Sequence, residues 1–196
     1  GSEMCIRDST TASDNTAVGY NSLTANTTGF SNTAIGKDAL AATTTGNTNT
    51  AVGVDALTTN TVGDKSTAVG YEALKTQNPA SNLDMLNTAV GFNAGLAVTT
   101  GIRNTFIGGL AGDALTDADN NIALGYASLS ADTLGSNSIA IGAGALATQN
   151  FTSATDTYNT AVGHNAGLLV TTGIQNTVIG GLAGDALTTG EVNVAV

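Results

Sequence analysis

Short runs of small and aliphatic residues recur along the chain at a nearly constant spacing. The run Asn15–Gly19, Asn-Thr-Ala-Val-Gly, returns as Asn32–Gly36 and Asn49–Gly53, and variants of it continue to the end of the sequence. An aliphatic residue precedes each glycine, usually with alanine before it and threonine before that. Thr, Val and Ile favour strands because their branched side chains fit a pleated surface. The pattern therefore predicts a short β-strand in every repeat.

The length of the repeat indicates a solenoid. Ten motif glycines end the complete copies: Gly19, Gly36, Gly53, Gly70, Gly91, Gly108, Gly125, Gly142, Gly163 and Gly180. Their positions advance in steps of 17, except for two steps of 21, from Gly70 to Gly91 and from Gly142 to Gly163. This period is too short for helical-hairpin repeats and is typical of solenoids of short strands. We predict an all-β fold, a parallel β-roll or β-solenoid with 17-residue coils and two 21-residue coils.

The repeat assigns an environment to each position. The aliphatic residue before each motif glycine is never polar, so we expect it to face the interior. The Asn four residues before that glycine is expected to form a hydrogen-bonded ladder along the solenoid axis. A second apolar pair, such as Ala39-Leu40, predicts a second strand, and a second glycine, such as Gly46, predicts a positive φ or a very tight bend. Each coil is thus expected to contain two strands and two corners.

A longer period is superimposed on the short one, because three steps of 17 and one step of 21 make a block of 72 that occurs twice. Residues 87–116 and 159–188 differ at only four positions, one of which exchanges Phe92 for His164. The two 21-residue coils are one block apart, so their insertions should project from the same side. Loops on a rigid scaffold often bind ligands, although a tolerated insertion without function is an alternative. The candidate binding-loop residues are Gln77, Asn78, Pro79, Gln149, Asn150 and Phe151.

Composition and charge narrow the class of protein. Aromatic residues are 4% of the chain and Trp is absent, while the 41% of hydrophobic residues are largely small, which favours thin stacked layers. The net charge of −10 argues against a nucleic-acid partner, which would require a basic stripe. No apolar run approaches the roughly 18 residues of a membrane span. We therefore expect no membrane insertion within this chain.

The sequence contains no recognisable catalytic or metal-binding set. Cys5 is the only cysteine and His164 the only histidine, and no paired-carboxylate motif is present. The segment 142–147 has the glycine spacing of a dinucleotide-binding loop, but the repeat already explains its glycines. We expect neither an enzyme nor a bound metal or cofactor.

Residues 1–10 match no position of the repeat, and we expect them to be a non-native or disordered segment. Gly1-Ser2 is typical of a cloning remnant, and residues 4–9 resemble a string that recurs at the ends of assembled environmental reads. Residues 11–196 are predicted to form a single β-roll domain. The last copy of the motif, Asn193–Val196, stops before its glycine, so we expect this domain to be truncated at its C-terminus.

The motif resembles that of a known repeat family. Ala17–Gly19 followed by Ser22-Leu23, and Ala34–Gly36 followed by Ala39-Leu40, resemble the repeats in the YadA-like heads of trimeric autotransporter adhesins and related repeats of phage tail fibres. The resemblance covers residues 15–196. It implies a left-handed parallel β-roll, a homotrimer, a location on the bacterial cell surface or the virion, and attachment to a host-cell or matrix surface ligand.

Two hypotheses for function follow. In the first, the chain is a segment of a structural or adhesive fibre, in which other copies of the chain cover an apolar column that does not face the coil's own interior. In the second, ladders of Thr form a flat face that binds ice. One ladder precedes the Ala-Val-Gly motif, and the other lies at a corner that includes Thr27 and Thr44.

Overall fold

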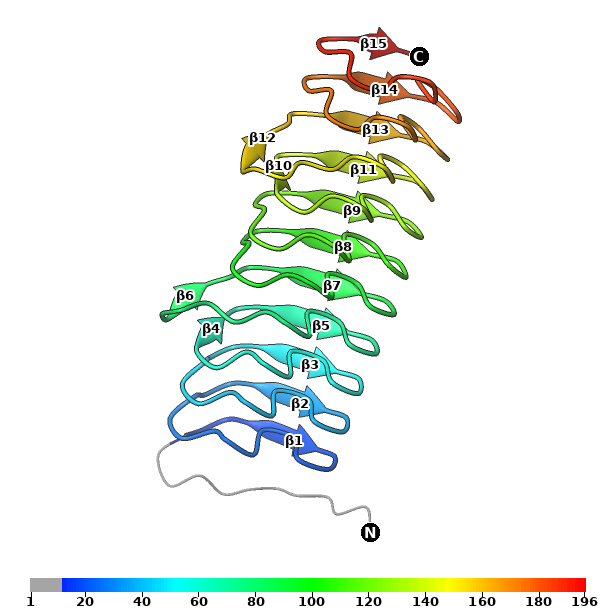
Figure 1. The fold of residues 1–196 in the computed structure, drawn as a ribbon. Coiled ribbons are helices and arrows are strands. Elements are labelled where there is room, and N and C mark those ends of the chain that lie inside the picture. Colours follow the sequence, from blue (N-terminus) through cyan, green and yellow to red (C-terminus); the bar gives the residue numbers. More distant parts are fainter. Residues whose placement is uncertain (1–11) are drawn as a thin grey trace.

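The computed structural model describes residues 12–196, a stack of coils that each add one strand to a continuous parallel sheet (Figure 1). The expectation for residues 1–10, Cys5 included, concerns residues outside this range. Residues 12–196 contain strands, turns and bends but no helix. The predicted all-β solenoid with 17-residue coils is confirmed.

The main sheet has eleven short parallel strands. They are β1 (Thr16–Val18), β2 (Thr33–Ile35), β3 (Thr50–Val52), β5 (Thr67–Val69), β7 (Thr88–Val90), β8 (Thr105–Ile107), β9 (Ile122–Leu124), β11 (Ile139–Ile141), β13 (Thr160–Val162), β14 (Thr177–Ile179) and β15 (Val194–Ala195). Neighbouring strands pair in register, so that Ala17 lies opposite Ala34 and Ala34 opposite Ala51. Residues at equivalent positions of the repeat therefore stack on one another along the solenoid axis.

The two faces of this sheet are the reverse of the sequence-based assignment. Successive side chains of a strand point to opposite faces. The central Ala34 of β2 is fully buried, whereas Val18 and Ile35 before the motif glycines are 40% and 39% exposed. The prediction that the aliphatic column faces the interior is therefore wrong. Leu side chains from the other side of the coil, such as Leu40, already fill the interior, which leaves space for only a methyl group beneath the strand.

The opposite side of each coil consists of tight turns rather than the predicted second strand. In the second coil, Asp38 and Leu40 both have positive φ, 57° and 50°, and such values are incompatible with an extended strand. The backbone nevertheless bonds from coil to coil, because Leu40 N donates to Ala56 O at 3.1 Å. The turn thus directs Leu inward while it keeps the stacking of the coils.

The motif glycines and the second glycine of each coil are required for different reasons. The ten motif glycines have φ between 127° and 141°, and a Cβ on Gly125 would lie 2.6 Å from the carbonyl carbon of Gly142 in the next coil. Gly46, in the second column, is outside the positive-φ region, but a Cβ there would lie 2.7 Å from Gly63 O. Close stacking of the coils, and not a positive φ, explains the second column.

The predicted ladder of Asn side chains is confirmed, and most of its bonds run to the backbone. Asn104 Oδ1 accepts a hydrogen bond from Asn121 N at 2.8 Å, and Asn104 Nδ2 donates to Ala118 O at 2.8 Å. The same pair of bonds recurs along the stack, for example from Asn32. These Asn side chains are buried, so water does not compete for the bonds that tie one coil to the next.

Around β8, the interior residue of the strand is larger than in most coils, and the interior residues of the adjacent turns are smaller. Phe106 stands at the inward position of β8, where most coils have Ala, and it is fully buried. Gly95 and Gly112 stand where other coils have Leu. A Cβ on Gly95 would lie 2.7 Å from the Phe106 ring, and one on Gly112 would come closer still. The ring therefore occupies the space of the two missing Leu side chains.

Candidate functional site

The side of the main sheet that points away from the coil interior carries two columns of side chains, together termed the outer face. The first column is Thr16, Thr33, Thr50, Thr67, Thr88, Thr105, Ile122, Ile139, Thr160, Thr177 and Val194. The second is Val18, Ile35, Val52, Val69, Val90, Ile107, Leu124, Ile141, Val162, Ile179 and Val196. Alternation along each strand places both columns on the same side, with the buried Ala between them.

The aliphatic column is partly exposed along the length of the sheet. Val90 is 37% exposed and Ile179 is 42% exposed. In β9 both columns are aliphatic, because Ile122 replaces Thr beside Leu124. A continuous apolar stripe on a protein surface marks an interaction site. The residues that sequence analysis placed in the core therefore form a surface available to a partner.

The two Thr ladders differ in how their hydroxyl groups are used. At the corner, Thr44 Oγ1 donates to Thr61 O and Thr99 Oγ1 donates to Thr116 O, each at 3.2 Å. Within residues 12–196, the outer-face Thr hydroxyls make no hydrogen bond inside the chain. Of the two ladders, the outer-face one presents free hydroxyl groups, in consecutive coils from Thr16 to Thr105 and again at Thr160 and Thr177.

The two 21-residue coils each add a buried glutamine beside the Asn ladder, in register with Asn60 and Asp132 of the preceding coils. Gln77 is fully buried, its Nε2 donates to Ser66 Oγ at 3.1 Å, and its Oε1 accepts from Asn87 Nδ2 at 3.0 Å. Ser66 stands in the Asn column, and the longer Gln side chain fills the space that the short Ser leaves. Gln149 makes the equivalent bond to Ser138 at 2.9 Å. Gln77 and Gln149 therefore have a structural role, in contrast to their prediction as binding-loop residues.

The other predicted loop residues are divided between interior and surface. Pro79 and Phe151 are buried and pack the base of each insertion, whereas Asn78 and Asn150 are exposed. Apolar rings at these positions pack inward, since a Cβ on Gly63 would lie 3.1 Å from Pro79 Cδ. Of the six predicted residues, only the two Asn can meet a ligand, and the exposed parts of the insertions are mainly residues 80–84 and 152–154.

The exposed insertions end in short strand pairs on one side of the solenoid. Strand β4 (Gly63–Asp64) pairs with β6 (Leu83–Asp84), and β10 (Gly135–Ser136) pairs with β12 (Thr155–Asp156). Figure 1 shows both pairs at the same side of the stack, as predicted. Asp84 Oδ2 lies 2.6 Å from Lys65 Nζ, and Asp156 Oδ1 lies 2.8 Å from Asn137 Nδ2. The two insertions thus present a carboxylate at equivalent positions.

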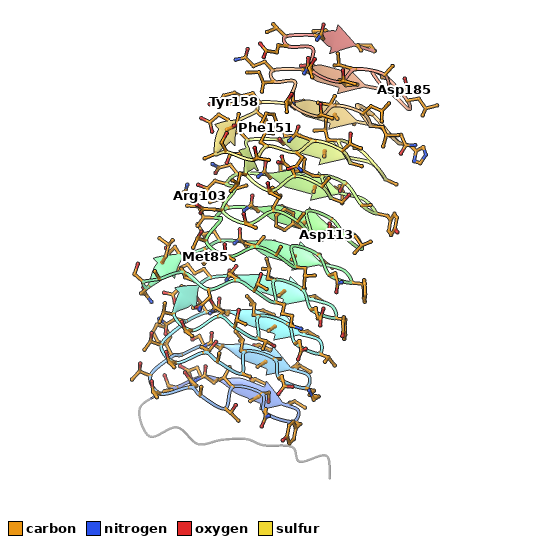
Figure 2. The ribbon with its side chains drawn as sticks, viewed as in Figure 1. Met85, Arg103, Asp113, Phe151, Tyr158 and Asp185 are labelled. Carbon is orange, nitrogen blue, oxygen red and sulfur yellow. The ribbon has the colours of Figure 1, made fainter. Side chains whose placement is uncertain are left out.

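Among the buried and partly buried carboxylates, Asp132 and Asp113 differ in their hydrogen bonding. Asp132 is fully buried and accepts hydrogen bonds from Gly135 N at 3.1 Å, Phe151 N at 3.0 Å and Gln149 Nε2 at 2.6 Å. Asp113, labelled in Figure 2, has a buried Oδ1 without a hydrogen-bond partner in the described part of the chain. Burial raises the pKa of the Asp113 carboxyl above its usual value. No group of three or more His, Cys, Asp or Glu in residues 12–196 is placed to hold a metal ion.

The residue after each motif glycine lies at the first corner of its coil and is often aromatic. Phe92 is 55% exposed, and its ring stacks on that of Tyr71 with centroids 5.4 Å apart and planes 9° apart. His164 occupies the same exposed column. The Phe92 to His164 exchange is evident in the sequence, but the aromatic column that contains it was not predicted. The signal was there, since Tyr20 and Tyr126 also follow motif glycines.

No protein-family model, curated protein or solved structure matches this chain. In residues 12–196, no helix is long and apolar enough to cross a membrane. The features that can support a function are therefore those of the molecule itself: the outer face, the insertions and the column at the first corner.

Proposed function

We propose that the chain is a segment of a structural or adhesive fibre, in which three copies pack side by side through their outer faces. The observation that carries this proposal is the aliphatic column, which stays aliphatic in all ten complete repeats although it is exposed in the single chain. Solvent exposure gives no reason to exclude polar residues so consistently. Burial against other copies of the chain explains why polar residues are excluded from this column.

The magnitude of this burial suits a long rod. Full burial of an aliphatic side chain stabilises by about 1.5–3 kcal/mol, so covering an exposed fraction of at most about two-fifths contributes up to about 0.6–1.2 kcal/mol per residue. Ten residues therefore contribute at most about 6–12 kcal/mol per chain, which is comparable with the entropic cost of association, about 4–15 kcal/mol. Association then depends on how many coils are in contact, as expected for a fibre.

In the proposed fibre the coils form a stiff shaft that displays the insertions. Each coil is bonded to the next by backbone groups and by buried Asn side chains, so the shaft has few exposed backbone groups for proteases to attack. The pairs β4–β6 and β10–β12 project on one side, where a host-cell or matrix surface ligand can reach them. We place this fibre on a bacterial cell surface or a virion, with attachment as its role.

The oligomeric mass tests the proposal. Sedimentation or light scattering of the purified protein is expected to give three times the single-chain mass of 19.2 kDa. The pair of changes Leu124→Asp and Ile141→Asp places charges in the outer face and is expected to dissociate the trimer. Thr45→Asp, at an exposed corner residue outside that face, is the control and should leave the mass unchanged. A single-chain mass at all concentrations would refute the proposal.

Ice binding is a second candidate function, supported by the unpaired hydroxyls of the outer-face Thr column. From Thr16 to Thr105 these hydroxyls repeat once per coil, about 4.8 Å apart, beside a column of aliphatic side chains, and Ile122 and Ile139 then interrupt the array. A flat array of hydroxyl and methyl groups would suit a regular solid surface such as ice. The two functions require the same face, so a trimer and an ice-binding chain exclude each other. Absence of thermal hysteresis and of ice shaping would remove this candidate.

A further inference from the structure

The first column of the outer face changes from Thr to Ile in two adjacent coils. Ile122 of β9 and Ile139 of β11 stand where the strands on either side, β8 and β13, have Thr (Figure 1). Leu124 and Ile141 lie beside them in the second column. We term these four residues the outer-face patch. Ile122 and Leu124 are 39% and 40% exposed, so the patch is an apolar surface two coils long.

The outer-face patch distinguishes one level of the stack from all others. In the first 72-residue block, the positions of Ile122 and Ile139 are occupied by Thr50 and Thr67. Across residues 12–196, no other two adjacent coils have aliphatic residues in both columns of the outer face. The patch therefore marks a single position along an otherwise repetitive surface.

The repetitive part of the outer face does not by itself align the copies of the proposed fibre. A copy displaced by one coil, about 4.8 Å, would still place Thr level with Thr and aliphatic residues level with aliphatic residues over most of the face. Register is weakly specified where every position offers the same contact. Alignment requires a feature that occurs at one level, and the outer-face patch is such a feature.

The Thr hydroxyls on either side of the patch make misalignment costly. The hydroxyls of Thr105 and Thr160 have no hydrogen-bond partner within the part of the chain that the structure describes. Once buried between copies they need a partner, and a Thr hydroxyl of a neighbouring copy can both donate and accept. Aliphatic side chains cannot do either, so we expect the first columns of the copies to face one another.

We propose that Ile122 and Ile139 set the axial register of the copies in the proposed fibre, on which this role rests, by packing against the same two residues of the neighbouring copies. Copies related by a threefold axis lie at the same level, as this contact requires. A displacement by one coil would bring Thr105 level with Ile122 and Ile139 level with Thr160, which leaves buried hydroxyls unpaired. Each of these two mismatched levels should disfavour the displaced arrangement about tenfold.

Disulfide formation between two single-cysteine variants measures the register. Thr33→Cys and Thr50→Cys lie in adjacent coils away from the patch, and both variants also carry Cys5→Ser, which removes the only native cysteine. The two chains, one of them with a size tag, are refolded together and oxidised. A disulfide requires Cα atoms within about 7 Å, so 33–33 and 50–50 links report aligned copies and 33–50 links report displaced ones. Links between identical positions should exceed 33–50 links at least about tenfold.

Loss of the patch should remove this preference. Ile122→Thr with Ile139→Thr makes the first column uniform through these coils and should lower the ratio of aligned to displaced links at least about fivefold. Thr already stands at this position in β8 and β13, so the fold accommodates both changes. Leu124→Thr with Ile141→Thr is the matched control, because it removes aliphatic groups from the same two coils but only in the second column. The control should leave the ratio unchanged.

The molecular mass separates failure of this role from failure of the fibre. With a trimeric mass, the role of Ile122 and Ile139 is overturned if identical positions do not link, or if 33–50 links are equally frequent in the chain with an intact patch. It is also overturned if Ile122→Thr with Ile139→Thr leaves the ratio unchanged, or if the control lowers the ratio as much. A single-chain mass at all concentrations would instead overturn the fibre itself, and the register role with it.

Discussion

Replacement of Phe106 by Ala should open a cavity that the neighbouring side chains, such as Leu74, can close only in part. The Phe106 ring is fully buried between Gly95 and Gly112, and neither neighbour has a side chain that could move into the vacated space. Phe-to-Ala changes in cores cost about 3–5 kcal/mol, with the largest costs where the site collapses least. We therefore expect a loss of about 4–5 kcal/mol, near the upper end of that range.

The repeat itself suggests the variant that should restore stability. Coils with Ala at the inward strand position have Leu at the turn, as in the pair Ala34 and Leu40, and Leu40 has φ 50°. Gly95 and Gly112 have φ 60° and 57°, so Leu fits their backbone as it fits that of Leu40. Adding Gly95→Leu and Gly112→Leu to Phe106→Ala should recover at least half of the loss. Gly112→Leu alone should destabilise the chain, because the ring already occupies that space.

Native-state hydrogen exchange is the suitable assay, because long repeat arrays depart from two-state unfolding. The opening free energy of amides in β7, β8 and β9 should fall in Phe106→Ala and rise again in the triple variant. Amides of β1 to β3 should change little and provide the internal reference, since each coil contacts only its neighbours. A loss below about 1 kcal/mol, or a triple variant no better protected than Phe106→Ala, would refute this account of the packing.

Two further predictions concern buried polar groups. Asn104→Ala removes the partners of Asn121 N and Ala118 O, and leaving two buried groups unpaired should cost about 2–4 kcal/mol, measurable as lost amide protection in β8 and β9. Asp113→Asn should stabilise the chain at neutral pH by no more than about 1 kcal/mol, because burial raises the folded-state pKa of this half-buried carboxyl and so penalises its charged form. In thermal melts the gain should vanish below the unfolded pKa, grow as pH rises from the unfolded to the folded pKa, and stay constant at higher pH.

The periodicity of the sequence was sufficient to predict the solenoid. A fixed spacing between copies of the motif requires that equivalent residues stack, and the in-register pairing of Ala17, Ala34 and Ala51 is the direct result. The Asn ladder followed from the same argument, because a buried amide that repeats once per coil has the next coil as its nearest partner. The stacking of the coils and the Asn ladder could therefore be predicted without knowing which way each side chain points.

Side-chain direction was predicted incorrectly because apolar character was taken as a sign of burial. The alternation of Thr33, Ala34 and Ile35 places the first and third residues on one face, and a Thr column indicates that this face points outward. The Leu turn was missed for another reason. A non-glycine residue with positive φ, such as Leu40, is uncommon, and the sequence does not show that stacking against neighbouring coils holds it in this conformation.

The residues before and after each motif glycine form two exposed columns, and only the first of them has a constant composition. In the outer face, the residue before the motif glycine is aliphatic in every complete repeat, from Val18 to Ile179. The residue after the same glycine varies from Lys37 to Tyr126, although it is at least as exposed in many coils. Two columns of one strand and corner experience the same solvent and the same stacking, so neither factor explains the difference. A uniform contact along the axis, as in the proposed fibre, would account for the constant column, and the variable column requires no such contact.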